Sequence, residues 1–194
     1  GVSKASSTYE ARDLLRTPHD ADLFDYYATS QLAVVNAAAG EATRIGRPAV
    51  YFGVEAAPGG GYILVERLRR PYSFLVACHR FAKDVEVWTT AGEPVETVAS
   101  LPLADQVPID GVPEGPRDHA WRPTAPATLH WTEALDGGDP KAKVPHRDRL
   151  MLKPIGGTAI PDALAAALAP AAGRAAADRP YVIVFLTAGK PTIG

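Results

Sequence analysis

The histidines and aspartates in the second half of the chain have the side chains best suited to acid–base chemistry or metal binding. They are His119, His130, His146, Asp136, Asp139 and Asp148. None of them has the C-x-x-C or H-E-x-x-H spacing that brings ligands together before the chain folds. We therefore predict no metal site and no cofactor, and we interpret these residues as polar positions that hold turns and loops.

A nucleophile for covalent catalysis is the next chemistry to consider. Cys78 precedes His79, but neighbours on a strand point to opposite faces, so we expect a buried structural thiol and no thiol–imidazole pair. The G-x-S-x-G motif of α/β-hydrolases is absent from the sequence, and the nearest string, GVSKA at residues 1–5, lacks the final glycine. We predict that the chain has no catalytic triad and is inactive on its own.

Three arginines and three tryptophans remain as candidates for substrate contact. The arginines are Arg117, Arg122 and Arg147. We favour a structural role, in which the arginines hold loops through bidentate hydrogen bonds to nearby carboxylates. The alternative is that they line a channel for peptides. The tryptophans are Trp88, Trp121 and Trp131. Each lies in a strand-like pattern, so we expect them to pack between sheets.

Composition limits the partners of the chain. Its 194 residues are 46% hydrophobic and 22% charged, which is typical of one soluble domain. A formal net charge of −2 predicts no general affinity for nucleic acids or acidic membranes. The single cysteine excludes an intrachain disulfide. No apolar run reaches the roughly 18 residues of a membrane helix, and the first residues lack the apolar core of a signal peptide.

Two short helices are expected near the N-terminus. Ser7 and Glu10 match a capping box, which predicts a helix through Leu15. Thr17 is a good N-cap in front of Pro18, a residue favoured at the first helical position. The second helix is therefore predicted to begin at Pro18.

Short β-branched and aromatic runs, broken by Gly, Pro and Asp, predict an antiparallel all-β region after the helices. The predicted strands are 32–36, 42–45, 49–55, 62–68, 74–77, 85–89, 95–99, 119–122, 128–134 and 148–153. The DGGD sequence at 136–139 predicts the turn of a long hairpin. Four prolines within 101–118 exclude a central strand and predict an ordered crossing over the surface.

Two internal repeats indicate the architecture. The stretches 33–45 and 85–98 both read strand, Ala-Gly-Glu turn, strand, and their turn glycines lie about 50 positions apart. The stretches 57–66 and 125–133 both read Pro-marked turn, then apolar strand. A spacing close to that of a four-stranded blade favours a β-propeller.

Several motifs in the same region resemble one protein family. In order they are 18–20, 23–24, 26–32, 70–73, 85–88, 101–104, 107–109, 115–117, 121–123, 126–129, 131, 133–139 and 146–148. Through these motifs, residues 9–153 resemble the N-terminal propeller region of bacterial and plastid glutamyl endopeptidases, which are serine peptidases of the prolyl oligopeptidase family. The motifs keep the same order over that span, which argues against a chance match.

The resemblance implies a peptidase with two domains. A β-propeller without a nucleophile restricts access to a cavity above the active site, and an α/β-hydrolase domain carries the Ser, Asp and His triad. We therefore expect this chain to be the non-catalytic, substrate-gating portion of a peptidase whose intact form cleaves after acidic residues. Its partners would be peptides and the missing α/β-hydrolase domain. The alternative is a stand-alone β-rich module that binds peptides or proteins without enzymatic activity.

The predicted organisation has three parts: a helical segment (1–30), a partial β-propeller of about two to two and a half blades (31–153) and an atypical Ala/Pro-rich tail (154–194) with a short helix and a strand over 181–186. The resemblance stops near Leu152, so we expect a truncation or a shift of reading frame there, and a native linker followed by a strand is the alternative. Gly1 is not an initiator methionine, so an upstream targeting signal could be lost. The sequence is compatible with a cytoplasmic or a periplasmic protein. Exposed sheet faces and a strand edge predict self-association.

Overall fold

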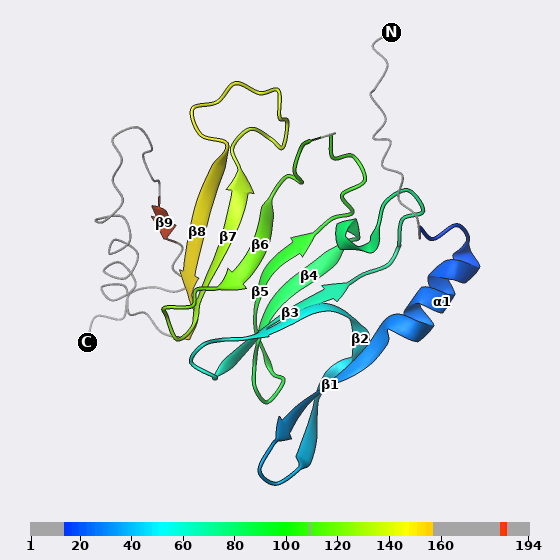
Figure 1. Cartoon of the computed structure of the whole chain (residues 1–194), viewed down its shortest axis with the longest axis vertical. Helices are drawn as coiled ribbons and strands as arrows, with labels where there is room; N and C mark the ends of the chain where they lie inside the picture. The colour runs from blue at the N-terminus through cyan, green and yellow to red at the C-terminus, as the bar shows by residue number, and fades with distance from the viewer. Residues whose placement is uncertain (1–13, 109, 157–182, 186–194) are drawn as a thin grey trace.

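The computed structural model describes residues 14–108, 110–156 and 183–185, and these form mostly β-structure in two sheets after one helix (Figure 1). The helix is α1 (Pro18–Ala28). The larger sheet has the order β1-β2-β3-β4-β5, with β1 (Thr29–Asn36), β2 (Glu41–Ala56), β3 (Tyr62–Leu68), β4 (Lys83–Thr89) and β5 (Pro94–Leu101). The smaller sheet has the order β6-β7-β8-β9, with β6 (Pro116–Trp121), β7 (Thr128–Ala134), β8 (Asp148–Pro154) and β9 (Ile183–Phe185).

Neighbouring strands are antiparallel throughout the larger sheet and from β6 to β8, as the sequence predicts. β9 pairs parallel with β8 and falls inside the strand predicted over 181–186. The two sheets do not close into a ring within the described residues. The predicted mostly β fold is therefore confirmed: the described residues form two sheets, preceded in the sequence by one α-helix.

The helix α1 begins where its capping sequence predicts. The Thr17 side chain accepts a hydrogen bond from the Asp20 N–H at 3.2 Å, and the Asp20 carboxylate accepts from the Thr17 N–H at 2.9 Å. Pro18 takes the first turn, where its missing N–H costs nothing. Arg70 fastens the helix to the larger sheet through its ion pair with Asp25 at 2.5 Å. The other predicted helix, from Ser7, lies outside the described residues except for its last two positions.

The strand predictions succeed where polar and apolar residues alternate. Strands β3 and β7 coincide with the predictions 62–68 and 128–134. The predictions 42–45 and 49–55 are parts of one long strand, β2, whose register shifts beside Phe52.

The strand predicted over 74–77 is wrong. The Ser73 hydroxyl accepts a hydrogen bond from the Leu75 N–H at 3.0 Å, and such a local bond competes with a sheet ladder. A short 3₁₀ helix, Cys78–Arg80, follows. Cys78 therefore lies in a helical turn and not on a strand, and it is half-buried against the Tyr72–Phe81 cluster.

Both internal repeats form the predicted turns and strands, but the two hairpins of the first repeat lie in one sheet, so their spacing is not that of successive blades. The turns at Gly40 and Gly92 join β1 to β2 and β4 to β5, and both glycines have positive φ, +71° and +85°. The Pro-marked turns lead into β3 and β7, and they touch each other, because the Gly59 N–H donates to the Pro126 carbonyl at 2.7 Å. Corresponding parts of the two sheets thus lie side by side.

The two sheets pack face to face around a shared core. Its buried members are Ala57, Leu64, Val85, Val87, Trp121, Leu129, Trp131, Met151 and Ile155. The Trp121 indole N–H also donates to the Glu55 carbonyl of β2 at 3.0 Å. Trp88 is buried on the other face of the larger sheet. The predicted packing between sheets is confirmed for Trp121 and Trp131 and is wrong for Trp88, which packs against residues of its own sheet.

The proline-rich segment crosses from β5 to β6 and so joins the two sheets, as predicted. β6 begins at Pro116, within that segment, because an edge strand accepts proline as its first residue. The DGGD turn lies in the loop between β7 and β8, also as predicted. The predicted helix of the tail lies outside the described residues.

Candidate functional site

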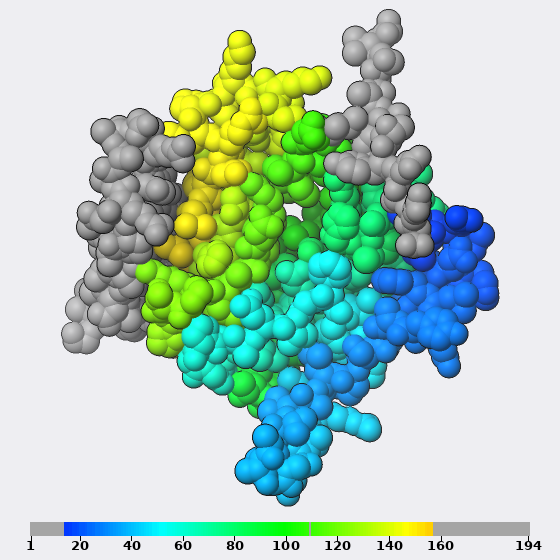
Figure 2. All heavy atoms as spheres, in the orientation of Figure 1, coloured from blue at the N-terminus to red at the C-terminus, as the bar shows by residue number. Residues whose placement is uncertain are grey.

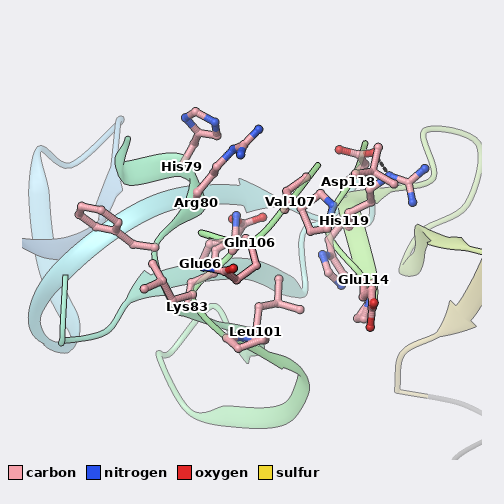
Figure 3. A pocket seen from close by; sticks show the side chains of 18 of the residues that line it. Glu66, His79, Arg80, Lys83, Leu101, Gln106, Val107, Glu114, Asp118 and His119 are labelled. Atoms are coloured by element: carbon pink, nitrogen blue, oxygen red, sulfur yellow. Dashed lines mark hydrogen bonds and ion pairs between the residues drawn. The ribbon is translucent and has the colours of Figure 1, made fainter. Parts of the chain in front are cut away.

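A cavity of about 550 Å³ lies between the ends of the two sheets, beneath the proline-rich crossing. Its volume is in the range of small-ligand sites. The apolar part of the wall includes Phe52, Leu101, Leu103, Val107 and Val112. The polar part includes Glu66, Lys83, Glu114, Arg117, Asp118 and His119. Figure 3 shows Glu66 and Lys83 on one side of the cavity and His119 and Glu114 on the other.

Neighbouring strands of the larger sheet supply an ion pair to the cavity. Glu66 of β3 and Lys83 of β4 lie 2.7 Å apart, Oε2 to Nζ, and both side chains are mostly buried. The Lys83 ammonium also lies 4.7 Å from the centre of the Phe52 ring. Removal of either partner would leave a charge without compensation in a partly buried place. The pair is thus a fixed, locally neutral part of the wall.

His119 comes from the smaller sheet. Its ring stacks on Trp131 with centroids 6.0 Å apart, and its Nε2 is buried without a hydrogen-bond partner among the described residues. Burial lowers the pKa of His119, the nearby Glu66 carboxylate opposes that shift, and the Lys83 ammonium adds to it. The imidazole is therefore neutral at neutral pH, and its Nε2 is buried in the wall of the cavity.

Arg117 lies two residues before His119 on β6. Its Nη2 donates to Asp148 Oδ1 at 2.6 Å, while its Nη1 is buried with no hydrogen-bond partner in the described part of the chain. The register of β6 against β7 is irregular here, and Asp118 has a positive φ of +56°. Such irregularities change the direction of side chains at the edge of a sheet. Here two side chains with an unused polar nitrogen line one cavity.

The other two candidate arginines lie elsewhere. Arg122 donates through Nε to the Thr124 hydroxyl at 3.0 Å. Arg147 donates to Asp136 at 3.0 Å and to the Pro140 carbonyl at 2.7 Å, which holds the loop between β7 and β8. Neither lines the cavity, so the structure does not bring the three arginines together.

Glu66 and Lys83 were not predicted from the sequence, and His119 was a candidate for acid–base chemistry or metal binding and not for lining a cavity. The one available signal was the presence of two charged residues, Glu66 and Arg67, in the otherwise mostly apolar run YILVERL. Within the described residues, no three His, Cys, Asp or Glu side chains come close enough to hold a metal ion. Asp136 and Asp148, two of the metal candidates, bind arginines.

The residue types in the lining indicate which ligands the cavity can accept. The described lining residues include no serine, threonine or cysteine. Three acidic and three basic residues line it, which favours an uncharged ligand: Glu66, Glu114, Asp118, Arg80, Lys83 and Arg117. Arg117 Nη1 and His119 Nε2 are both buried in the cavity wall, so a ligand could reach them only if the wall shifts.

Comparison with known proteins identifies relatives in plants. The chain is 46% identical over 151 residues to "Probable glutamyl endopeptidase, chloroplastic" of Oryza sativa subsp. japonica, which is 75% of this chain and 16% of the relative. It is 49% identical over 139 residues to the protein of the same name in Arabidopsis thaliana, which is 71% of this chain and 14% of the relative. No family model matches the chain, and no solved structure matches it.

The matched relatives are thus far longer than this chain, which spans about one sixth of their length or less. Both are named as chloroplast proteins. In the described part of this chain, no helix has the length and apolar character needed to span a bilayer. The resemblance seen in the motifs is confirmed: the chain is homologous to a short segment of the plant glutamyl endopeptidases.

Proposed function

We propose that this chain is the non-catalytic, substrate-gating propeller portion of a serine peptidase of the prolyl oligopeptidase family. The intact protein would hydrolyse peptide bonds after acidic residues, with the triad supplied by an α/β-hydrolase domain. The observation that carries the proposal is the 46–49% identity to a segment of relatives named glutamyl endopeptidases.

The packing of the sheets supports the propeller assignment. Strands β2 to β5 form one four-stranded antiparallel meander, and β6 to β8 begin a second. The first strands of the two meanders are linked by the hydrogen bond from Trp121 to Glu55, and the equivalent turns are linked by the one from Gly59 to Pro126. Consecutive blades of a propeller are four-stranded meanders that pack face to face in this order.

The cavity is the place where we propose that the segment contacts peptides. Arg117 keeps the channel role considered for it, because it is the one of the three candidate arginines that lines the cavity. Arg122 and Arg147 would act more remotely, by holding loops.

Activity of the intact gene product tests the peptidase proposal. We expect the full-length protein to cleave a peptide after glutamate and to lose this activity with a serine-directed fluorophosphonate. The 194-residue chain should neither cleave the peptide nor take up the label. Cleavage by the short chain, or fluorophosphonate-resistant cleavage by the full-length protein, would contradict the proposal.

A stand-alone binding module is the second candidate, and the cavity with its mixed apolar and polar lining favours it. Calorimetric titration of the 194-residue chain with an acetylated, amidated tri-leucine peptide distinguishes this possibility. Binding should weaken at least about tenfold in Arg117→Ala, because a charged side chain that lines the cavity would be lost. The matched control is Arg44→Ala, an exposed arginine of β2 far from the cavity lining, which should bind like the parent. No binding by the parent chain would exclude a peptide-binding module of this kind.

A further inference from the structure

Strand β1 lies at one edge of the larger sheet. In the described sheet order it pairs with β2 and with no other strand. The β1–β2 hairpin projects from the body as a separate lobe at the bottom of Figure 1 and Figure 2. The outer N–H and C=O groups of β1 are therefore available to another strand.

The sequence of β1 lacks the features that protect sheet edges. Its residues, TSQLAVVN, include no charged side chain and no proline. Val34 and Val35 are 42% and 60% exposed, on opposite faces of the strand. The only shift in its pairing with β2 lies between Ser30 and Leu32, so 32–36 is a regular, uncharged edge.

The opposite edge of the sheet shows the contrast. Strand β5 begins with Pro94, carries Glu96 and has two register shifts against β4. Glu96 is also paired with Lys153 of the smaller sheet. Proline, charge and irregular pairing are the usual means by which edge strands avoid other strands. One edge of this sheet is protected and the other is not.

We propose that β1 pairs antiparallel with β1 of a second copy of this chain, across a two-fold axis. Such a contact is isologous, so an uncharged strand meets its own copy without like-charge repulsion. A two-fold axis perpendicular to the sheet places one residue opposite its own copy, and apolar residues near Val34 would then face one another. This contact would mediate the self-association expected from the sequence, and it does not depend on the proposed peptidase role.

Matched charge substitutions at the two edges test the contact. Sedimentation equilibrium of the 194-residue chain should show a concentration-dependent dimer. Val35→Lys should raise the dimer dissociation constant at least about tenfold, because it places two ammonium groups close together. Val95→Lys adds the same charge to a 45% exposed valine of β5 and should change the constant less than about twofold.

Both substitutions lie at exposed positions, so circular dichroism should show that the variants keep the fold. A parent chain that stays monomeric at all accessible concentrations would overturn the proposal. Equal weakening by the two lysines would overturn it too, because the β1 edge would then have no special role.

A cysteine scan identifies the register. In a Cys78→Ser background, Ala33→Cys, Val34→Cys and Val35→Cys are each oxidised under mild conditions. Opposite residues of antiparallel strands have Cα atoms about 4.5–5.5 Å apart, within disulfide range, so the position on the axis should cross-link fastest. Val95→Cys is the control. Cross-linking at Val95→Cys as fast as at the best β1 position would contradict the β1 contact.

Discussion

The two hairpins that share an Ala-Gly-Glu turn have the same local form and opposite surroundings. Gly40 and Gly92 both adopt a positive φ. A Cβ atom on Gly40 would have no neighbour within 4 Å, whereas one on Gly92 would lie 2.6 Å from Ile45 Cβ. The turn of the β4–β5 hairpin is thus packed against β2, while the turn of the β1–β2 hairpin stands free.

The strands that enter these turns differ in the same way. Val85 and Val87 of β4 are completely buried between the sheets, while Val34 and Val35 of β1 are exposed. Turn chemistry therefore determines that a hairpin forms, and the neighbouring elements determine whether it is buried. The β4–β5 hairpin contributes fully buried side chains to the core, whereas β1 of the β1–β2 hairpin is an exposed edge strand.

The largest expected difference between the hairpins concerns their side chains. Trp88 of β4 is 4% exposed, packs on Tyr51 and donates to Glu86 at 2.9 Å. Trp88→Ala should lower the free energy of unfolding by about 3–5 kcal/mol, and Val35→Ala should change it by less than about 0.5 kcal/mol. Urea denaturation measures both. Similar losses would show that the exposed valine of β1 contributes to stability as much as a buried side chain of β4.

The turn glycines should differ next. An alanine with positive φ is strained by roughly 1–2 kcal/mol, which is the whole cost expected for Gly40→Ala. In Gly92→Ala the methyl group also meets Ile45, so the loss should reach about 2–4 kcal/mol. Thermal unfolding of the two variants side by side measures the difference. Equal losses would mean that the backbone of the Gly92 turn shifts enough to accommodate the methyl group without displacing β2.

The cap of α1 provides a reference between these extremes. Thr17→Ala removes the acceptor for the Asp20 N–H and should cost about 1 kcal/mol. Thr17→Ser keeps that acceptor and serves as the control. In urea denaturation the loss should be larger than that of Val35→Ala and smaller than that of Gly92→Ala. A smaller loss than that of Val35→Ala would show that the helix end is not coupled to the sheet.

The smallest expected effect is a pH dependence of stability that affects the two packed sheets and not the β1–β2 hairpin. His119 has a lowered pKa in the folded chain, so between its unfolded value near pH 6.5 and its folded value only the unfolded chain binds a proton. Stability should therefore fall as the pH decreases from 7 towards 5. Amide exchange protection should decrease at Val87 and stay unchanged at Val34.

The control for the pH experiment is His119→Gln, which keeps a polar side chain and removes the titration. The difference in protection at Val87 between pH 7 and pH 5 should become smaller in this variant. An unchanged difference would assign the pH dependence to groups other than His119.

Features determined by neighbouring residues were predictable from the sequence. The Thr17 cap with Pro18 defines the start of α1, and alternating residues define β3 and β7. The turn glycines predicted both hairpins. The strand predicted at 74–77 was wrong because one hydroxyl, that of Ser73, bends the backbone.

Features that depend on distant contacts were not predictable in this way. Glu66, Lys83 and His119 come from three strands of two sheets, and they meet only after the sheets pack. The exposure of β1 is likewise a property of its neighbours, because its valines fit a buried strand equally well. Arg117 was named as a candidate, but its unused nitrogen depends on the irregular start of β6.

The contact between the two Pro-marked turns determines where the molecule can accept extra sequence. Gly59 lies so close to Pro126 that even a Cβ atom would sit 2.9 Å from the proline ring. An insertion in either turn would therefore push the sheets apart at their common core. Residues 37–40 have open space around Gly40, so an epitope tag or an evolutionary insertion is best accommodated at that hairpin tip.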